Sequence, residues 1–250
     1  MGQRPMVLAA AQIASIPGNV AANMAEHLRY AAVAAAHGAQ LLVFPELSLT
    51  GYELGLARQC TLTPGSDALD GLRRQARAAR MTIVAGAPLR NDSGGWNIGA
   101  IVIHPAGHVT THTKIHVHAS ERSVFEPGPG GPDLIAGEAS VALAICADAS
   151  QPQHAANAAS RGAGIYAVGA MIEESAYERK AALLEGYARE HHMAVLLANY
   201  SGTTGGELSA GRSAFWSEEG RLITAAQGAV PSLIVASRKA GRWSAFPVQM

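Results

Sequence analysis

The sequence has little charge, few aromatic residues and only two cysteines. Charged residues make up 15% of the 250 and aromatic residues 5%, and 19 basic side chains are balanced by 19 acidic ones. Nucleic acid and anionic membranes bind proteins with a basic excess, so a net charge of zero argues against both as the main partner. One disulfide between Cys60 and Cys146 is formally possible. In a reducing compartment we expect both to be free thiols.

Long apolar runs are also missing. No stretch reaches the roughly 20 residues that a membrane-spanning helix needs. The apolar run over residues 6–13 is soon followed by Pro17 and is too interrupted for an export signal. We therefore expect a cytoplasmic protein that does not act at a membrane. Hydrophobic residues make up 48% of the chain, which predicts one well-buried domain over residues 1–250 and a small molecule as its partner.

Strand-like and helix-like segments alternate from end to end. We expect strands at 7–13, 41–44, 81–87, 96–104, 108–113, 140–146, 164–169, 194–199, 212–216, 221–224 and 231–236. We expect helices at 19–37, 67–80, 147–161 and 174–191. The alternation predicts an α/β fold with helices packed on sheets, and the hairpin at 105–107 predicts mixed sheets. The long loop at 114–132, rich in Gly and Pro, is typical of a functional segment.

Three residues that could carry chemistry each end a predicted strand: Glu46, Lys114 and Cys146. Ligands of α/β folds bind in the crevice at such strand ends. Taken singly, each residue has a simpler interpretation, as a solvated acid, a solvated lysine or a buried inert cysteine. Cys146 stands out because a helix is expected to begin just after it. The positive end of that helix dipole would favour the thiolate, and a nearby ammonium would add to the effect.

Six motifs occur in one order along the chain. They are Phe44-Pro-Glu-Leu-Ser-Leu-Thr-Gly-Tyr52, Thr113-Lys-Ile-His116 with Glu121 and Phe125-Glu-Pro-Gly128, Ile145-Cys-Ala-Asp148, Tyr187-Ala-Arg-Glu190, Ala198-Asn-Tyr-Ser-Gly202 and Gly211-Arg-Ser213. In kind, spacing and order they resemble the nitrilase, or carbon-nitrogen hydrolase, superfamily. The resemblance covers essentially the whole chain.

The resemblance implies a four-layer αββα sandwich and a catalytic triad of Glu46, Lys114 and Cys146. It also implies that Glu121 supports the lysine and that the protein forms a homodimer or a larger homo-oligomer. The sequence departs from the family pattern in two places. An alanine, Ala147, follows the cysteine where many members have tyrosine, and residues 169–174 lack the usual Pro-Ala-aromatic group. Both departures fall near the substrate pocket and leave the triad intact.

These residues predict amide hydrolysis through a thioester. Cys146 would attack the amide carbon while Glu46 acts as the general base. Lys114 and the backbone N–H of Ala147 would stabilise the oxyanion. Glu46 would then protonate the leaving ammonia or amine and activate the hydrolytic water. No cofactor is needed, and the sequence has no phosphate loop or dinucleotide fingerprint.

The substrate is harder to predict than the reaction. We expect Tyr52, Met171 and Ile172 to contact it, and the segment around the last two is not basic. This favours small or apolar-sided amides over N-carbamoyl acids, whose carboxylate needs a basic partner. A true nitrilase would usually be longer, with tryptophan after the cysteine, and an acyltransferase would usually be attached to a membrane or to another domain. N-carbamoyl amidohydrolase or nitrilase activity on the same triad, or a non-catalytic binding protein of this fold, stays an alternative.

Two other patterns invite a different chemistry. Five histidines crowd one stretch, which could indicate a metal site; they are His104, His108, His112, His116 and His118. The expected hairpin there does not favour a ligand set, and we assign no metal. Ser213 could be read as a nucleophile, but its motif lacks the second glycine of a nucleophile elbow. We expect structural roles for Ser213 and for Asn199, which would brace a loop.

Overall fold

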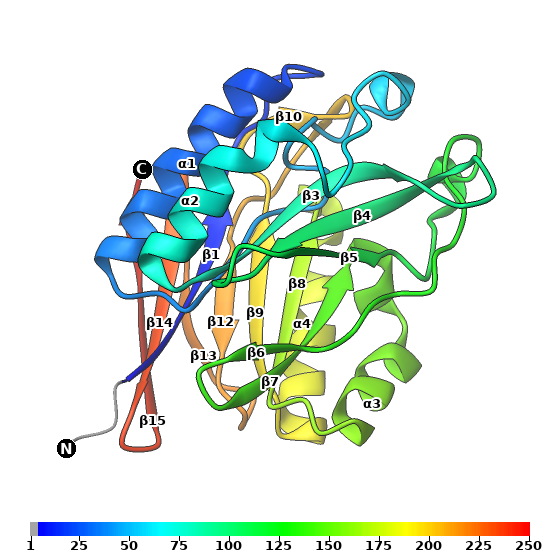
Figure 1. Cartoon of the computed structure of the whole chain (residues 1–250). Coiled ribbons are helices and arrows are strands. Elements are labelled where there is room, and N and C mark those ends of the chain that lie inside the picture. Colours follow the sequence, from blue (N-terminus) through cyan, green and yellow to red (C-terminus); the bar gives the residue numbers. More distant parts are fainter. Residues whose placement is uncertain (1–4) are drawn as a thin grey trace.

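The computed structural model describes residues 5–250 and contains two large mixed sheets that face each other (Figure 1). The strand order of the seven-stranded sheet is β15-β14-β1-β2-β3-β4-β5, and that of the six-stranded sheet is β13-β12-β9-β8-β7-β6. Strands β1, β2 and β3 run parallel at the centre of the first sheet, as do β7, β8 and β9 in the second. Hairpins extend each sheet with antiparallel strands.

The elements of the first half supply most of the seven-stranded sheet and two helices. They are β1 (Met6–Gln12), α1 (Val20–Ala36), β2 (Leu41–Val43), α2 (Asp70–Ala79), β3 (Thr82–Arg90), β4 (Trp96–Ile103) and β5 (Val109–Thr113). The second half supplies the other sheet, two helices and a small separate hairpin. Its elements are β6 (Leu134–Ala136), β7 (Ala139–Ile145), α3 (Pro152–Ser160), β8 (Ile165–Ala170), α4 (Glu174–His191), β9 (Ala194–Asn199), β10 (Thr203–Thr204), β11 (Glu207–Leu208), β12 (Ala214–Trp216) and β13 (Leu222–Ala225). The chain then returns to the first sheet through β14 (Ser232–Lys239) and β15 (Arg242–Gln249).

Three hydrophobic layers hold these elements together. One lies between the two sheets and includes Val43 and Leu143. A second joins the first sheet to α1 and α2, and a third joins the second sheet to α3 and α4. Helices therefore cover the outer face of each sheet (Figure 1). This is the four-layer αββα arrangement that the resemblance implied.

Some elements differ from the sequence expectation. The helix expected at 147–161 is divided into a 3-10 helix, Cys146–Ser150, and α3, because Pro152 starts a new helix at its first position. Strands β6, β10, β11 and β15 were not expected. In β15 nearly every residue is at least partly exposed and Pro247 interrupts the pattern, so its pairing with β14 defines it rather than its own periodicity.

Within residues 5–250, no helix is both long enough and apolar enough to cross a membrane.

Candidate active site

Glu46 lies in a tight turn between the two sheets, just after β2. The turn has little room on either side: a Cβ atom on Gly86 of β3 would come within 2.3 Å of the backbone nitrogen of Leu47. A Cβ on Gly169 of β8 would come within 2.7 Å of the carbonyl oxygen of Phe44. Glycine at both positions lets the turn enter the sandwich, so the Glu46 carboxylate is buried between the sheets.

Lys114 follows β5, and its side chain is completely buried. Its ammonium donates to Glu46 Oε1 at 2.6 Å and to both carboxylate oxygens of Glu121, at 2.7 and 2.8 Å. An ammonium in the protein interior needs such partners, since a buried unpaired charge is strongly destabilising. The structure thus brings together three of the residues that the sequence analysis selected.

The carboxylate of Glu121 accepts hydrogen bonds at both of its oxygens. Tyr52 Oη donates to its Oε1 at 2.6 Å, and the backbone N–H of His118 donates to its Oε2 at 2.7 Å. With the two contacts from Lys114, both oxygens of this carboxylate are engaged. The contact of Tyr52 with Glu121 was not expected from the sequence, because residues 52 and 121 belong to loops far apart in the chain.

Cys146 sits at a sharp turn where β7 ends. Its φ of 43° lies in the left-handed region, which is strained for a residue with a side chain. Its Sγ lies 3.6 Å from the carbonyl oxygen of Met171, which follows β8. Ala147 is the second residue of the 3-10 helix, where the backbone N–H has no acceptor within the helix. This N–H therefore stays available to a ligand beside the thiol.

Asp148 joins the segment of Lys114 to that of Cys146. Its Oδ1 accepts the backbone N–H groups of Ile115 and His116 at 3.1 and 2.7 Å. Its Oδ2 accepts the backbone N–H of Ile145 at 3.1 Å. The carboxylate is fully buried, so a single side chain fixes the residues next to both the ammonium and the thiol. Nothing in the sequence pattern beyond the Cys-Ala-Asp motif pointed to this role.

The environment of Glu46 prepares it for proton transfer. Burial raises its pKa to about 7, although the neighbouring Lys114 ammonium opposes the shift. Oε1 accepts from Lys114, whereas Oε2 has no hydrogen-bond partner among residues 5–250. The Cys146 thiol is close enough to lower the pKa of Glu46 in turn. One oxygen of a buried carboxylate is thus free to take up a proton near neutral pH.

The thiol differs from the sequence expectation. Burial, and after it the charge of Glu46, raises the pKa of Cys146 to about 12, although the Lys114 ammonium opposes the increase. The expected thiolate is therefore not the form of Cys146 that this environment favours. Cys146 begins a short 3-10 helix rather than α3, so the stronger dipole lies further along the chain. With its pKa raised this far, Cys146 carries its proton near neutral pH. Burial alone would lower the pKa of Lys114, but Glu46, Cys146 and Glu121 raise it well above its usual range.

A cavity of about 660 Å³ opens in front of Cys146. Tyr52, Met171 and Ile172, the expected substrate contacts, all line it, together with Glu121 and Ala147. The sequence analysis missed one wall, which α4 provides. From this helix Ser175, Ala176, Arg179, Lys180 and Leu184 face the cavity.

The structural roles expected for Asn199 and Ser213 agree with their contacts. Asn199 Oδ1 accepts the backbone N–H of Ile172, and its Nδ2 donates to the carbonyl oxygen of Gly211. Ser213 Oγ accepts the backbone N–H of Asn199. These bonds brace the segment that carries Met171 and Ile172 along the cavity.

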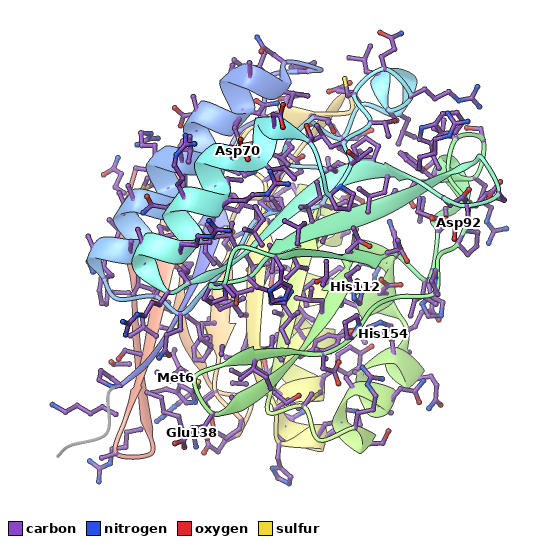
Figure 2. All side chains as sticks on the ribbon, in the orientation of Figure 1. Met6, Asp70, Asp92, His112, Glu138 and His154 are labelled. Atoms are coloured by element: carbon purple, nitrogen blue, oxygen red, sulfur yellow. The ribbon has the colours of Figure 1, made fainter. Side chains whose placement is uncertain are left out.

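The crowded histidines do not converge on one point. His104 and His108 stack on each other, and His116 contacts Asp148. His112 is buried on β5, on the side of the molecule that also carries His154 of α3 (both labelled in Figure 2). Among residues 5–250, no group of three or more His, Cys, Asp or Glu side chains is placed to hold a metal ion.

An αββα sandwich with a buried glutamate and lysine pair beside a cysteine that lines a cavity defines the class of nitrilase-like proteins. Residues 7–247 match the family described as carbon-nitrogen hydrolase. The chain belongs to this family.

Solved structures agree with this assignment. A variant of the amidase from Nesterenkonia sp. AN1 in complex with butyramide superposes with a TM-score of 0.85 at 27% identity, covering 94% of this chain and 92% of that one. Another variant of that amidase carries the acetamide moiety of fluoroacetamide covalently at its active-site cysteine, with a TM-score of 0.85 and 26% identity over 96% of this chain and 93% of that one.

Curated relatives match over shorter segments. A nitrilase from Pyrococcus abyssi is 32% identical over 139 residues, which are 54% of this chain and 53% of the relative. An (R)-stereoselective amidase from Pseudomonas sp. is 30% identical over 159 residues, covering 63% of this chain and 57% of the relative. The matches thus span little more than half the length of these two relatives.

Proposed function

We propose that the protein hydrolyses the carbon-nitrogen bond of a small amide, with Cys146 as nucleophile, Glu46 as general acid and base, and Lys114 as an electrostatic stabiliser. One observation carries the proposal: Cys146 lines the cavity as a neutral thiol, and the buried Glu46 beside it pairs with the Lys114 ammonium through one carboxylate oxygen and has the other oxygen free. Stability alone would not favour a buried carboxylate and a buried thiol at these positions, because burying an ionisable side chain costs free energy.

Acylation begins with the proton on sulfur. As Sγ attacks the amide carbon, Oε2 of Glu46 takes the thiol proton, so the sulfur becomes nucleophilic only when substrate is bound. The carbonyl oxygen develops negative charge, which the N–H of Ala147 and Lys114 stabilise. An ammonium has three N–H donors, and one of them can serve both oxygens of Glu121. A third donor is then left for the oxyanion.

The second half of the reaction reverses these proton transfers. Glu46 gives its proton to the nitrogen as the carbon-nitrogen bond breaks, and ammonia or an amine leaves. A water molecule then attacks the thioester on Cys146 while Glu46 accepts one of its protons. Sulfur leaves, regains its proton, and the carboxylic acid product is released. Amide and water are consumed and no cofactor takes part.

The solved structures that match the chain almost from end to end support an amide as substrate. The Nesterenkonia amidase binds butyramide, and its chain is matched almost from end to end. In this chain the cavity wall formed by Met171, Ile172 and Ala176 is apolar, which suits the short alkyl part of such a compound.

Ammonia release from a panel of aliphatic amides, dicarboxylic monoamides, N-carbamoyl compounds and nitriles tests the proposal. We expect release from at least one amide and none from the Cys146→Ala variant. A Cys60→Ala variant is the matched control and should keep full activity, because Cys60 lies outside the cavity. Release that persists in Cys146→Ala, or no release from any compound, would contradict the proposed function.

A further inference from the structure

The wall of the cavity that α4 forms carries charge that the proposed reaction does not use. Lys180 is half-buried there, and its ammonium donates to the hydroxyl of Ser150. Arg179, the preceding residue, also lines the cavity and is exposed to solvent. Among the described residues, neither cation pairs with a carboxylate.

Three of the four acidic residues of α4 are already engaged elsewhere, and the fourth, Glu190, does not line the cavity. Glu174 and Glu178 both pair with Arg212, at 2.5 and 2.7 Å. Glu185 pairs with Arg189 on the outer surface at 3.2 Å. Lys180 is thus left with a neutral hydroxyl as its partner, although a half-buried ammonium gains most from an anion. A ligand in the cavity can supply that anion.

Glu121 also lines the cavity, but it is paired with Lys114, and the other two acidic side chains of the lining lie at the far end from Lys180. Glu173 precedes α4 and Glu207 belongs to β11; Ser209, two residues on, forms a bridge to Glu173. Lys180 lies seven residues further along the helix than Glu173, or about 10 Å at 1.5 Å per residue. The cavity therefore separates its charges, with cations at the Ser150 end and carboxylates at the hairpin end.

The cationic end lies within reach of the thiol. Ser150 is the last residue of the 3-10 helix that Cys146 begins. Four residues of 3-10 helix span about 8 Å at 2 Å per residue. A substrate whose amide carbon is at Sγ could reach Lys180 with a carboxylate two or three methylene groups away, because each carbon-carbon bond is about 1.5 Å long.

We propose that Lys180, with Ser150 and Arg179, forms a subsite for an anionic group, and that the preferred substrates are short amides carrying a carboxylate at the end remote from the amide. This inference rests on the proposed function and adds a substrate class to it. It differs from the sequence-based preference for small or apolar-sided amides. That preference considered only the segment at Met171 and Ile172, whereas the cations come from the next helix.

Matched pairs of substrates test the subsite. Succinamate and glutaramate carry the carboxylate, and butyramide and pentanamide are neutral amides of similar length. We expect kcat/KM to be at least about tenfold higher for the anionic pair, as one charge-assisted contact would provide. Lys180→Met should lower the ratio of anionic to neutral kcat/KM by about tenfold or more, mainly through KM. Arg189→Met, on the same helix but outside the cavity, should leave the ratio unchanged.

The outcomes separate the two proposals. Hydrolysis of butyramide that depends on Cys146, with no preference for succinamate and no change of the ratio in Lys180→Met, would overturn the subsite and leave the amidase intact. No Cys146-dependent hydrolysis of any of the four amides would overturn the proposed function itself. A far-ultraviolet circular dichroism melt shows whether Lys180→Met is folded. If it is not, Lys180→Arg, which keeps the positive charge, should retain the preference for succinamate, and loss of that preference in a folded Lys180→Arg would count against the subsite.

Discussion

The carboxylate of Asp148 accepts the backbone N–H of His116 at 2.7 Å, and this bond ties the loop after Lys114 to the turn that carries Cys146. The other oxygen of the same carboxylate accepts the N–H of Ile145. Two segments from different sheets thus meet at one buried anion. The relative position of ammonium and thiol is set by a residue that need not touch the substrate.

Replacing Asp148 with Asn should disturb this geometry. The amide group can accept at one atom only, so it must lose the bonds to one segment. We expect kcat/KM to fall about 10- to 100-fold and the free energy of unfolding to fall by about 2 kcal/mol. Steady-state kinetics and urea unfolding measure the two effects. Asp133→Asn, which breaks the surface pair with Arg161, is the control. Equal activity of the two variants would contradict the role of Asp148.

Replacing Glu121 with Gln should slow turnover without abolishing substrate binding. The variant keeps a side chain of the same shape but loses the charge that orients Lys114. We expect kcat to fall about tenfold or more and KM to change little. Tyr52→Phe, which removes one donor to Glu121, should show a smaller effect of the same kind. Glu126→Gln, in the same loop but bonded to Asn91 at the surface, should behave as the parent protein. Unchanged turnover in Glu121→Gln would refute the supporting role.

The activity should depend on the ionisation of Glu46. Its pKa is raised to about 7, and only the unprotonated carboxylate can accept the thiol proton. We therefore expect kcat/KM to rise with pH through about 7 and then to level off. The pKa of Cys146 is about 12, so ionisation of the thiol should add no second rise between pH 8 and 10. A rise centred near pH 8 to 9, typical of an ordinary thiol, would contradict the assignment of Glu46 as base.

His112 should make the fold sensitive to acid. Burial lowers the pKa of His112 from 6.5 to about 4, so the unfolded chain binds its proton first as the pH falls. The free energy of unfolding should therefore decrease between pH 6.5 and 4, by roughly 3 kcal/mol from this residue. His27, with a pKa also lowered to about 4, adds a similar decrease.

A single substitution separates the two histidines. Neither ring nitrogen of His112 has a hydrogen-bond partner among residues 5–250, so an apolar residue should be tolerated there. We expect His112→Leu to be more stable than the parent at pH 5, by about 1 kcal/mol or more, and to lose about half of the acid dependence. Urea unfolding at pH 5 and pH 7.5 measures this. If His112→Leu is less stable than the parent at both pH values, the imidazole ring stabilises the fold and the prediction is contradicted.

The order of strands and helices could be read from the sequence because each central strand is short, apolar and followed by a turn. The same pattern placed Glu46, Lys114 and Cys146 at strand ends. It could not show that two of these strands lie in one sheet and the third in the other. That arrangement depends on pairing between distant segments, such as β14 with β1.

The chemistry of the site was less predictable than its location. Whether Cys146 is a thiol or a thiolate depends on how deeply it is buried and on the distance to Glu46, and neither follows from spacing. The cations of α4 were missed for a related reason: the helix was expected, but not which of its residues turn toward the cavity. The homodimer and the cytoplasmic location stay predictions.

The central claim is that Cys146 is the reactive nucleophile of the site, and fluoroacetamide tests it most directly, because it alkylates a nucleophilic thiol with loss of fluoride. The adduct is measured by intact-protein mass spectrometry. We predict a mass increase equal to one acetamide moiety in the parent protein and in Cys60→Ala, and none in Cys146→Ala. An adduct that persists in Cys146→Ala and disappears in Cys60→Ala would place the reactive thiol outside the Glu46 and Lys114 site and contradict the account.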